Sequence, residues 1–104
     1  MRIAVVNESS TKNRNKDIIE ALASPSLLKY GFEILNLGMR DVDGEPDLTY
    51  IETGLISALA LNLGAADFVI GGCGTGQGFL NAVMQFPNVS CGLIYDPLEA
   101  WLFS

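Results

Sequence analysis

The stretch Phe68-Val69-Ile70-Gly71-Gly72-Cys73-Gly74-Thr75-Gly76-Gln77-Gly78 decides the fold of this chain of 104 residues. A β-prone apolar run leads directly into a glycine-rich turn, and the residues after the turn predict a helix over 78–85. Glycine lets the backbone turn sharply and approach a ligand closely. The free amides and the dipole of a helix N-terminus favour an anion, a developing oxyanion or the thiolate form of Cys73. Such a thiolate could act as a proton-transferring base.

The spacing of the glycines separates this turn from two common phosphate-binding motifs. Glycines alternate with other residues from Gly72 to Gly78, which does not fit the Gly-x-Gly-x-x-Gly fingerprint of dinucleotide-binding folds. The turn also follows the third predicted strand rather than the first, and no Lys follows it as in a Walker motif. The residues alone leave two interpretations open, an anion or enediolate site and a structural turn.

The rest of the chain alternates strand and helix patterns. The predicted strands cover residues 2–6, 32–37, 68–70 and 91–95. The helical patterns cover residues 18–23, 48–64, 78–85 and 98–103, with a short turn at 27–30. This alternation predicts a single α/β domain over residues 1–104, a three-layer Rossmann-like fold with a parallel sheet and helices on both faces. Because parallel strands end at one edge, we expect a ligand site where the loops 7–16, 71–78 and 95–97 meet.

The two parts of the chain differ in charge. All six Lys and Arg residues lie at or before Arg40, with four acidic residues, whereas residues 41–104 carry eight acidic residues and no basic ones. This distribution argues against nucleic-acid binding, which relies on clustered Lys and Arg. Lys12 and Arg14, in a polar loop before a helix, are candidate phosphate-binding residues. The alternative is that they lie on a solvated loop.

Other features limit the kind of protein. With no His and only two separated Cys residues, we expect no metal site. The apolar stretch 55–72 is interrupted by Asn62 and Asp67, so we expect no membrane segment. The N-terminus lacks the apolar core of a signal peptide, which predicts a cytoplasmic protein. The hydrophobic content of 49% is high for one small domain, and it suggests surface covered by a partner subunit, in a homodimer or higher homo-oligomer, or by missing chain.

The Cys-Gly-Thr-Gly-x-Gly sequence at residues 73–78 resembles the active-site loop of the family that includes ribose-5-phosphate isomerase B and galactose-6-phosphate isomerase. Residues 1–4, 63–67, 86–89 and 96–97 resemble the same family. The resemblance implies aldose–ketose isomerisation of a phosphorylated sugar through an enediolate, with no metal or cofactor. By the same resemblance, Cys73 moves the proton and Thr75 assists ring opening or orients the substrate. The amides of Gly74, Gly76 and Gly78 would stabilise the enediolate.

The chain departs from the family pattern after the first strand. The family carries Asp-His there, and this chain has Glu8-Ser9, which we take as substrate-binding candidates. Asp96 either caps the final helix or reaches the substrate. In the family, a ring-opening His and phosphate-binding Arg residues lie beyond the point where this chain stops, so we expect a fragment or truncated product. The absent Asp-His pair leaves a non-catalytic or differently acting sugar-phosphate-binding relative as the alternative, and a flavodoxin-like mononucleotide binder as a weaker one.

Overall fold

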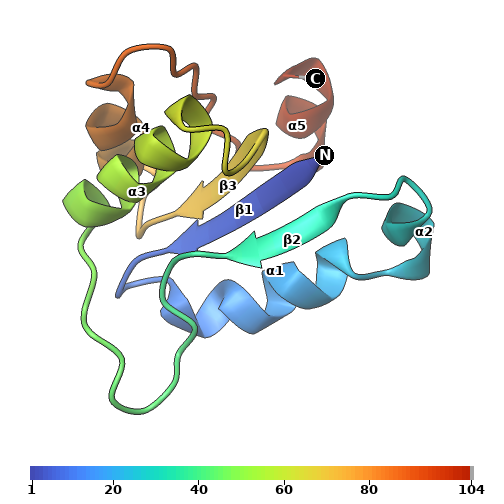
Figure 1. Ribbon diagram of the computed structural model, residues 1–104, viewed down its shortest axis with the longest axis horizontal. Helices are drawn as coiled ribbons and strands as arrows, with labels where there is room; N and C mark the ends of the chain where they lie inside the picture. Colours follow the sequence, from blue (N-terminus) through green and yellow to red (C-terminus); the bar gives the residue numbers. More distant parts are fainter. Residues whose placement is uncertain (104) are drawn as a thin grey trace.

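The computed structural model describes residues 1–103 and gives nine helices and strands within them. The strands are β1 (Arg2–Asn7), β2 (Glu33–Asn36) and β3 (Phe68–Gly72). The 3-10 helix η1 covers Lys12–Arg14, and the α-helices are α1 (Asn15–Leu22), α2 (Pro25–Leu28), α3 (Tyr50–Asn62), α4 (Gln77–Met84) and α5 (Pro97–Phe103). Figure 1 shows the three strands side by side, with their arrowheads pointing the same way.

The sheet has the order β2-β1-β3, and both pairs of neighbouring strands are parallel. β1 is central because its residues from Ile3 to Val6 are apolar and buried, as expected of a strand covered on both faces. In the register of the sheet, Asn7 at the end of β1 lies opposite Gly72 at the end of β3. The predicted parallel α/β architecture is confirmed.

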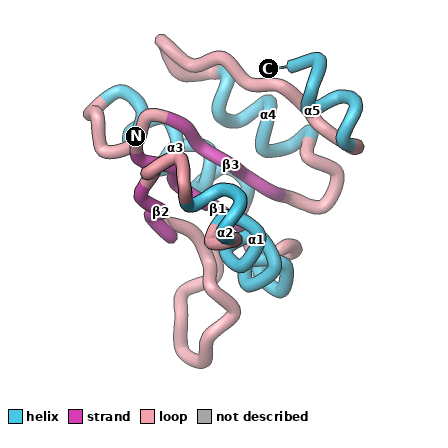
Figure 2. Tube along the Cα trace, turned by 90° about the vertical axis from the view of Figure 1, so that its right-hand side faces the viewer, coloured by secondary structure: helices cyan, strands magenta, loops and turns pink. Residues whose placement is uncertain are grey.

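The two faces of β1 are covered by different helices. Ala4 and Val6 form an apolar cluster with Ala60 of α3 and with Ala66, on one face of the sheet. On the other face, the Asn7 side chain donates from Nδ2 to Oδ1 of Asn15 in α1, at 3.0 Å. Successive strand residues point to opposite faces, so these contacts place α1 and α3 on opposite sides, in a three-layer arrangement. In Figure 2, α4 and α5 lie beyond β3, on the side away from β2.

The start of α3 shows why the helical pattern from residue 48 becomes a helix only at Tyr50. Thr49 is its N-cap, and its side-chain oxygen accepts from the Glu52 amide while the Glu52 side chain accepts from the Thr49 amide. This reciprocal capping box fixes the first turn, because it satisfies amides that have no partner within the helix.

The predicted fourth strand at residues 91–95 is wrong, because no strand is present there in the described chain. The segment follows α4 and passes β3 without pairing with it. Cys91, at the start of the segment, packs together with the preceding Val89 against a cluster that includes Phe79 and Val83. A cavity of about 1230 Å³ lies among the segment, β3 and neighbouring residues. Side-chain packing therefore takes the place of the predicted backbone pairing at this segment.

Candidate functional site

Two loops meet at the carboxyl edge of the sheet, where the chain connections diverge. The connection after β1 leads through α1 to β2 on one side, and α3 returns the chain to β3 on the other. Ligands of open α/β sheets bind at such a switch point, between the loops after the two adjacent strands. Thr11 Oγ1, in the first loop, donates to the Gly72 carbonyl at 3.1 Å. A Cβ placed on Gly74 would lie 3.5 Å from Ser10 Oγ, so the two loops are in contact.

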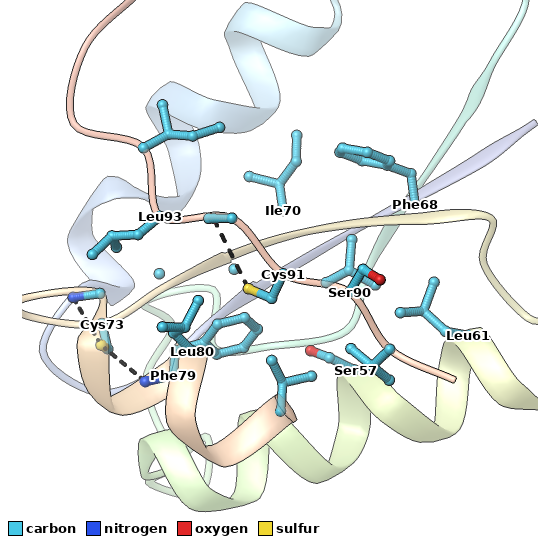
Figure 3. A pocket seen from close by; sticks show the side chains of 18 of the residues that line it. Ser57, Leu61, Phe68, Ile70, Cys73, Phe79, Leu80, Ser90, Cys91 and Leu93 are labelled. Atoms are coloured by element: carbon cyan, nitrogen blue, oxygen red, sulfur yellow. Dashed lines mark hydrogen bonds between the residues drawn. The ribbon is translucent and has the colours of Figure 1, made fainter. Parts of the chain in front are cut away.

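Cys73 lies at the start of the second loop with its sulfur turned toward α4. Its Sγ accepts from the Gly76 amide at 3.1 Å and from the Phe79 amide at 3.4 Å. Figure 3 shows both contacts, and it shows Cys73 and Cys91 on different segments lining one cavity. Amides at the beginning of a helix stabilise negative charge on an atom that they surround. Two backbone N–H groups therefore converge on the Cys73 sulfur.

Cys91 provides a contrast within the same cavity. It is half-buried, and burial raises the pKa of its thiol. Its Sγ has the Gly92 carbonyl as neighbour, at 3.9 Å, and a carbonyl does not stabilise an anion. The hydrogen bonds of the described residues thus give Cys73 amide donors at its sulfur and Cys91 a carbonyl.

Gly76 makes the turn from the loop into α4. Its φ of 81° lies in the left-handed region, where residues other than glycine are strained. A Cβ there would also lie 2.5 Å from Leu93 Cδ1, so the segment after α4 closes directly on the turn. Because the Gly76 amide donates to Cys73, it serves the sulfur in this structure rather than a substrate oxygen.

The other predicted loop residues differ in accessibility. Gly74 and Thr75 are exposed, so they are open to a ligand. Thr75 Oγ1 accepts from the Gln77 amide at 3.3 Å, and the Thr75 carbonyl accepts from the Tyr95 hydroxyl at 3.3 Å. Gly78 is half-buried because the Tyr50 ring lies beside it, with ring atoms 3.1–3.3 Å from where a Cβ would be.

Glu8 and Ser9 occupy the loop after β1 in different environments. The Glu8 side chain is 5% exposed, and its Oε1 accepts from the Ser10 amide at 2.8 Å and from the Ser10 hydroxyl. Ser9 is exposed, and its amide donates to the Leu48 carbonyl at 2.9 Å. The Glu8 carboxylate thus shapes the loop, while the Ser9 side chain is accessible to a ligand.

Sequence reasoning missed Asn7, the last residue of β1. Asn7 is 1% exposed, and it joins β1 to Asn15 of α1. A Cβ placed on Gly72 would lie 2.8 Å from Asn7 Oδ1, so Gly72 must be small for the two strand ends to meet. An Asn ending an otherwise apolar strand was the available signal, since a buried amide needs a partner.

The structure does not bring Lys12 and Arg14 to one ligand position. Arg14 lines a cavity of about 370 Å³ together with Thr11 and Gly72, next to the loop contact. Lys12 does not line this cavity. Hydrogen bonding by the Arg40 amide is the main cause that holds the pKa of Glu45, in the loop 38–47, below its usual value, and the Lys12 charge adds to it. Of the two basic residues, Arg14 is therefore the one that shares a cavity with residues of the candidate site.

Asp96 caps α5 in this structure. Its Oδ1 accepts from the Glu99 amide at 2.9 Å, and the Glu99 side chain accepts from the Tyr95 amide at 2.5 Å. Residues 1–103 contain no group of three or more His, Cys, Asp or Glu side chains that could hold a metal ion. Among the helices described, none is long and apolar enough to cross a membrane.

Comparisons with known proteins show the family and the fold. The family model described as Ribose/Galactose Isomerase matches residues 3–104. A 4-deoxy-L-threo-5-hexosulose-uronate ketol-isomerase, solved with a tartrate, is 47% identical over 100% of this chain and 48% of its own, with a TM-score of 0.93. A ribose-5-phosphate isomerase from Vibrio parahaemolyticus is 39% identical over 99% of this chain and 48% of its own, with a TM-score of 0.89.

A more distant structure has the same fold. Ribose-5-phosphate isomerase B from Clostridium thermocellum is 26% identical over 96% of this chain and 62% of its own, with a TM-score of 0.76. The chain thus spans about half the length of the first two relatives. A comparison with curated protein sequences finds no match.

Proposed function

Because the chain belongs to the ribose/galactose isomerase family, we propose that it interconverts an aldose and a ketose with Cys73 as the base. The observation that carries this proposal is the pair of amides, Gly76 and Phe79, that donate to the Cys73 sulfur at the switch point of the sheet. Stabilising negative charge on the sulfur keeps a base available beside the exposed loop residues Gly74 and Thr75.

The reaction moves one proton between adjacent carbons. The Cys73 thiolate takes the proton from the hydroxyl-bearing carbon beside the carbonyl, and the electrons of that C–H bond form the carbon–carbon double bond of an enediolate. The thiol then returns the proton to the former carbonyl carbon, while the hydroxyl proton passes between the two oxygens. In this proposal the exposed Gly74 amide donates to the enediolate oxygen, because preorganised donors stabilise charge that develops in the reaction. Thr75 and Ser9 hydroxyls orient the substrate.

The substrate in this proposal is a phosphorylated sugar, with Arg14 as the nearer candidate for its phosphate. A second candidate is a sugar uronate, because the uronate ketol-isomerase is 47% identical to this chain and the Vibrio enzyme 39%. Both substrates combine a reactive carbonyl with an anionic group. The phosphate candidate predicts that Arg14→Ala raises KM for sugar phosphates with little change in kcat.

The decisive experiment measures exchange of the carbon-bound proton beside the carbonyl in heavy water. A panel of pentose and hexose phosphates, together with the deoxyhexosulose uronate, is tested with the longest natural form of the chain. We expect Cys73→Ala to slow exchange about 10²- to 10⁴-fold, the contribution of a positioned acid–base group. Cys91→Ala is the matched control, since Cys91 lies in the same cavity without amides around its sulfur, and it should leave exchange nearly unchanged.

Two results would overturn this assignment. Equal exchange in wild type and Cys73→Ala would remove Cys73 as the base. Binding of a sugar phosphate without exchange would identify a non-catalytic or differently acting relative, for which the chain's lack of His offers the physical reason.

The proposal includes a homodimer, formed through the outer face of α3. Ile51, Leu55, Leu59 and Leu63 recur every four residues along this helix and its C-cap, and all are exposed. A surface stripe of this kind is typical of a protein interface. Leu55→Glu should convert a dimer to a monomer in sedimentation analysis. Leu28→Glu, on α2, is the control, because Leu28 is similarly exposed outside the stripe. A dimer that survives Leu55→Glu would place the interface elsewhere.

A further inference from the structure

One peptide unit connects Tyr95 to Cys73. The Tyr95 hydroxyl donates to the Thr75 carbonyl at 3.3 Å. The Thr75 carbonyl and the Gly76 amide belong to the same planar peptide group, with no cis peptide bond in the chain described. The Gly76 amide donates in turn to Cys73 Sγ at 3.1 Å. The two hydrogen bonds therefore lie at opposite ends of one rigid plane.

We propose that Tyr95 is a positioning residue for the Cys73 thiolate, acting through the Thr75–Gly76 peptide. A hydrogen bond to the carbonyl of a peptide polarises it, and this strengthens the hydrogen bond that its N–H donates. The Tyr95 hydroxyl also fixes the orientation of the peptide plane, and the plane directs the Gly76 N–H at the sulfur. This inference rests on the proposed function only for the task of Cys73 as a base. The connection from Tyr95 to the Cys73 sulfur does not depend on it.

The structure holds Tyr95 in place from the side of α5. The Tyr95 amide donates to the Glu99 side chain, and the Glu99 amide donates to Asp96 Oδ1, so the beginning of α5 anchors the Tyr95 backbone. Two positions earlier, Leu93 lies against Gly76, where a Cβ would come within 2.5 Å of its Cδ1. The segment 93–95 therefore contacts two consecutive residues of the Cys73 loop. The Tyr95 hydroxyl contacts Thr75, and Leu93 contacts Gly76.

The position of Tyr95 allows the hydroxyl to be removed without disturbing the core. Tyr95 is 67% exposed, so Tyr95→Phe leaves no buried cavity. In Tyr95→Phe, water takes the place of the hydroxyl at the Thr75 carbonyl, so the carbonyl loses a hydrogen-bond donor of fixed direction. Tyr50→Phe is the matched control. The Tyr50 ring lies against Gly78 at the start of α4, the helix that follows the Cys73 loop, but its hydroxyl takes no part in the hydrogen bonds that connect Tyr95 to Cys73.

The experiment measures the rate at which iodoacetamide alkylates each cysteine, as a function of pH, with peptide mapping by mass spectrometry. Alkylation follows the thiolate fraction, so the pH profile reports how well the protein stabilises the thiolate. In Tyr95→Phe we expect the Cys73 profile to move to higher pH, with a rate about two- to four-fold lower at neutral pH and an unchanged plateau at high pH. Tyr50→Phe should leave the Cys73 profile in place, and Cys91 serves as an internal reference in every variant.

The readout separates this inference from the proposed function. If the profile moves but no substrate exchanges its proton, the link from Tyr95 to Cys73 stands and the isomerase assignment fails. If wild type is an active isomerase but the profile does not move in Tyr95→Phe, the inference is wrong. Parallel changes at Cys73 and Cys91, or the same shift in Tyr50→Phe, would also overturn it, because they indicate general loosening. In an active enzyme, kcat should fall by the same two- to four-fold with KM unchanged, as expected when a base but not substrate binding is affected.

Discussion

The loops after β1 and after β3 lie in contact at the same edge of the sheet, but different groups give them their shapes. In the first loop a side chain does so, because the buried Glu8 carboxylate accepts from both the amide and the hydroxyl of Ser10. In the second loop the backbone does so, with the Gly76 and Phe79 amides turned to one sulfur and φ positive at Gly76. A backbone-shaped loop needs glycine at fixed positions, so its sequence is distinctive. A side-chain-shaped loop admits many sequences, and its contacts emerge only on folding.

The largest effect on stability should come from a substitution that strains the backbone conformation of the second loop. Gly76→Ala adds a Cβ at a φ of 81° and 2.5 Å from Leu93 Cδ1. We expect it to lower the free energy of unfolding by about 2–4 kcal/mol, from left-handed strain and overpacking together.

Gly44→Ala separates the two causes in Gly76→Ala. Gly44 has nearly the same φ, 80°, but open space where its Cβ would be. It should cost only the strain, about 1–2 kcal/mol, in the same denaturant unfolding measurement. Equal losses for the two variants would mean that the Leu93 contact with Gly76 does not constrain the turn.

A smaller effect is expected in the first loop, when the carboxylate is removed. Glu8→Ala leaves the Ser10 amide and hydroxyl without their acceptor, and we expect a loss of about 1–3 kcal/mol in the free energy of unfolding. Glu8→Gln keeps an oxygen that can accept both hydrogen bonds, so it should retain most of the stability. If Glu8→Gln is as unstable as Glu8→Ala, the charge of Glu8 rather than its acceptor geometry shapes the loop.

The smallest effect should follow from removing the hydrogen bond that joins the two loops. Thr11→Val removes the hydroxyl that donates to the Gly72 carbonyl at 3.1 Å and keeps the branched shape. The expected loss is about 0.5–1.5 kcal/mol, the usual net value of one hydrogen bond. Thr11→Ser retains the hydroxyl and should be closer to wild type in thermal unfolding. The opposite order would show that Thr11 contributes its methyl group rather than its hydrogen bond.

The sequence predicted the fold correctly where local and tertiary preferences agree. The apolar run of β1 and the glycine turn before α4 each specify their element from a few neighbouring residues. The fourth strand failed for the opposite reason. The apolar residues at 91–95 are compatible with a strand, but Val89 and Cys91 pack against the cluster that includes Phe79, and the backbone does not pair with β3.

By itself, the sequence determined the parallel α/β class, because the alternation of strand and helix patterns is read from neighbouring residues. The glycine spacing likewise made Cys73 and the carboxyl edge the candidates for the site. Only the tertiary structure decided which atoms meet there. It brought the Tyr95 hydroxyl to the Thr75 carbonyl, twenty positions earlier in the chain, and the Thr11 hydroxyl to the Gly72 carbonyl. These contacts join segments far apart in sequence, and their directions depend on how helices and strands pack rather than on any residue's own preference.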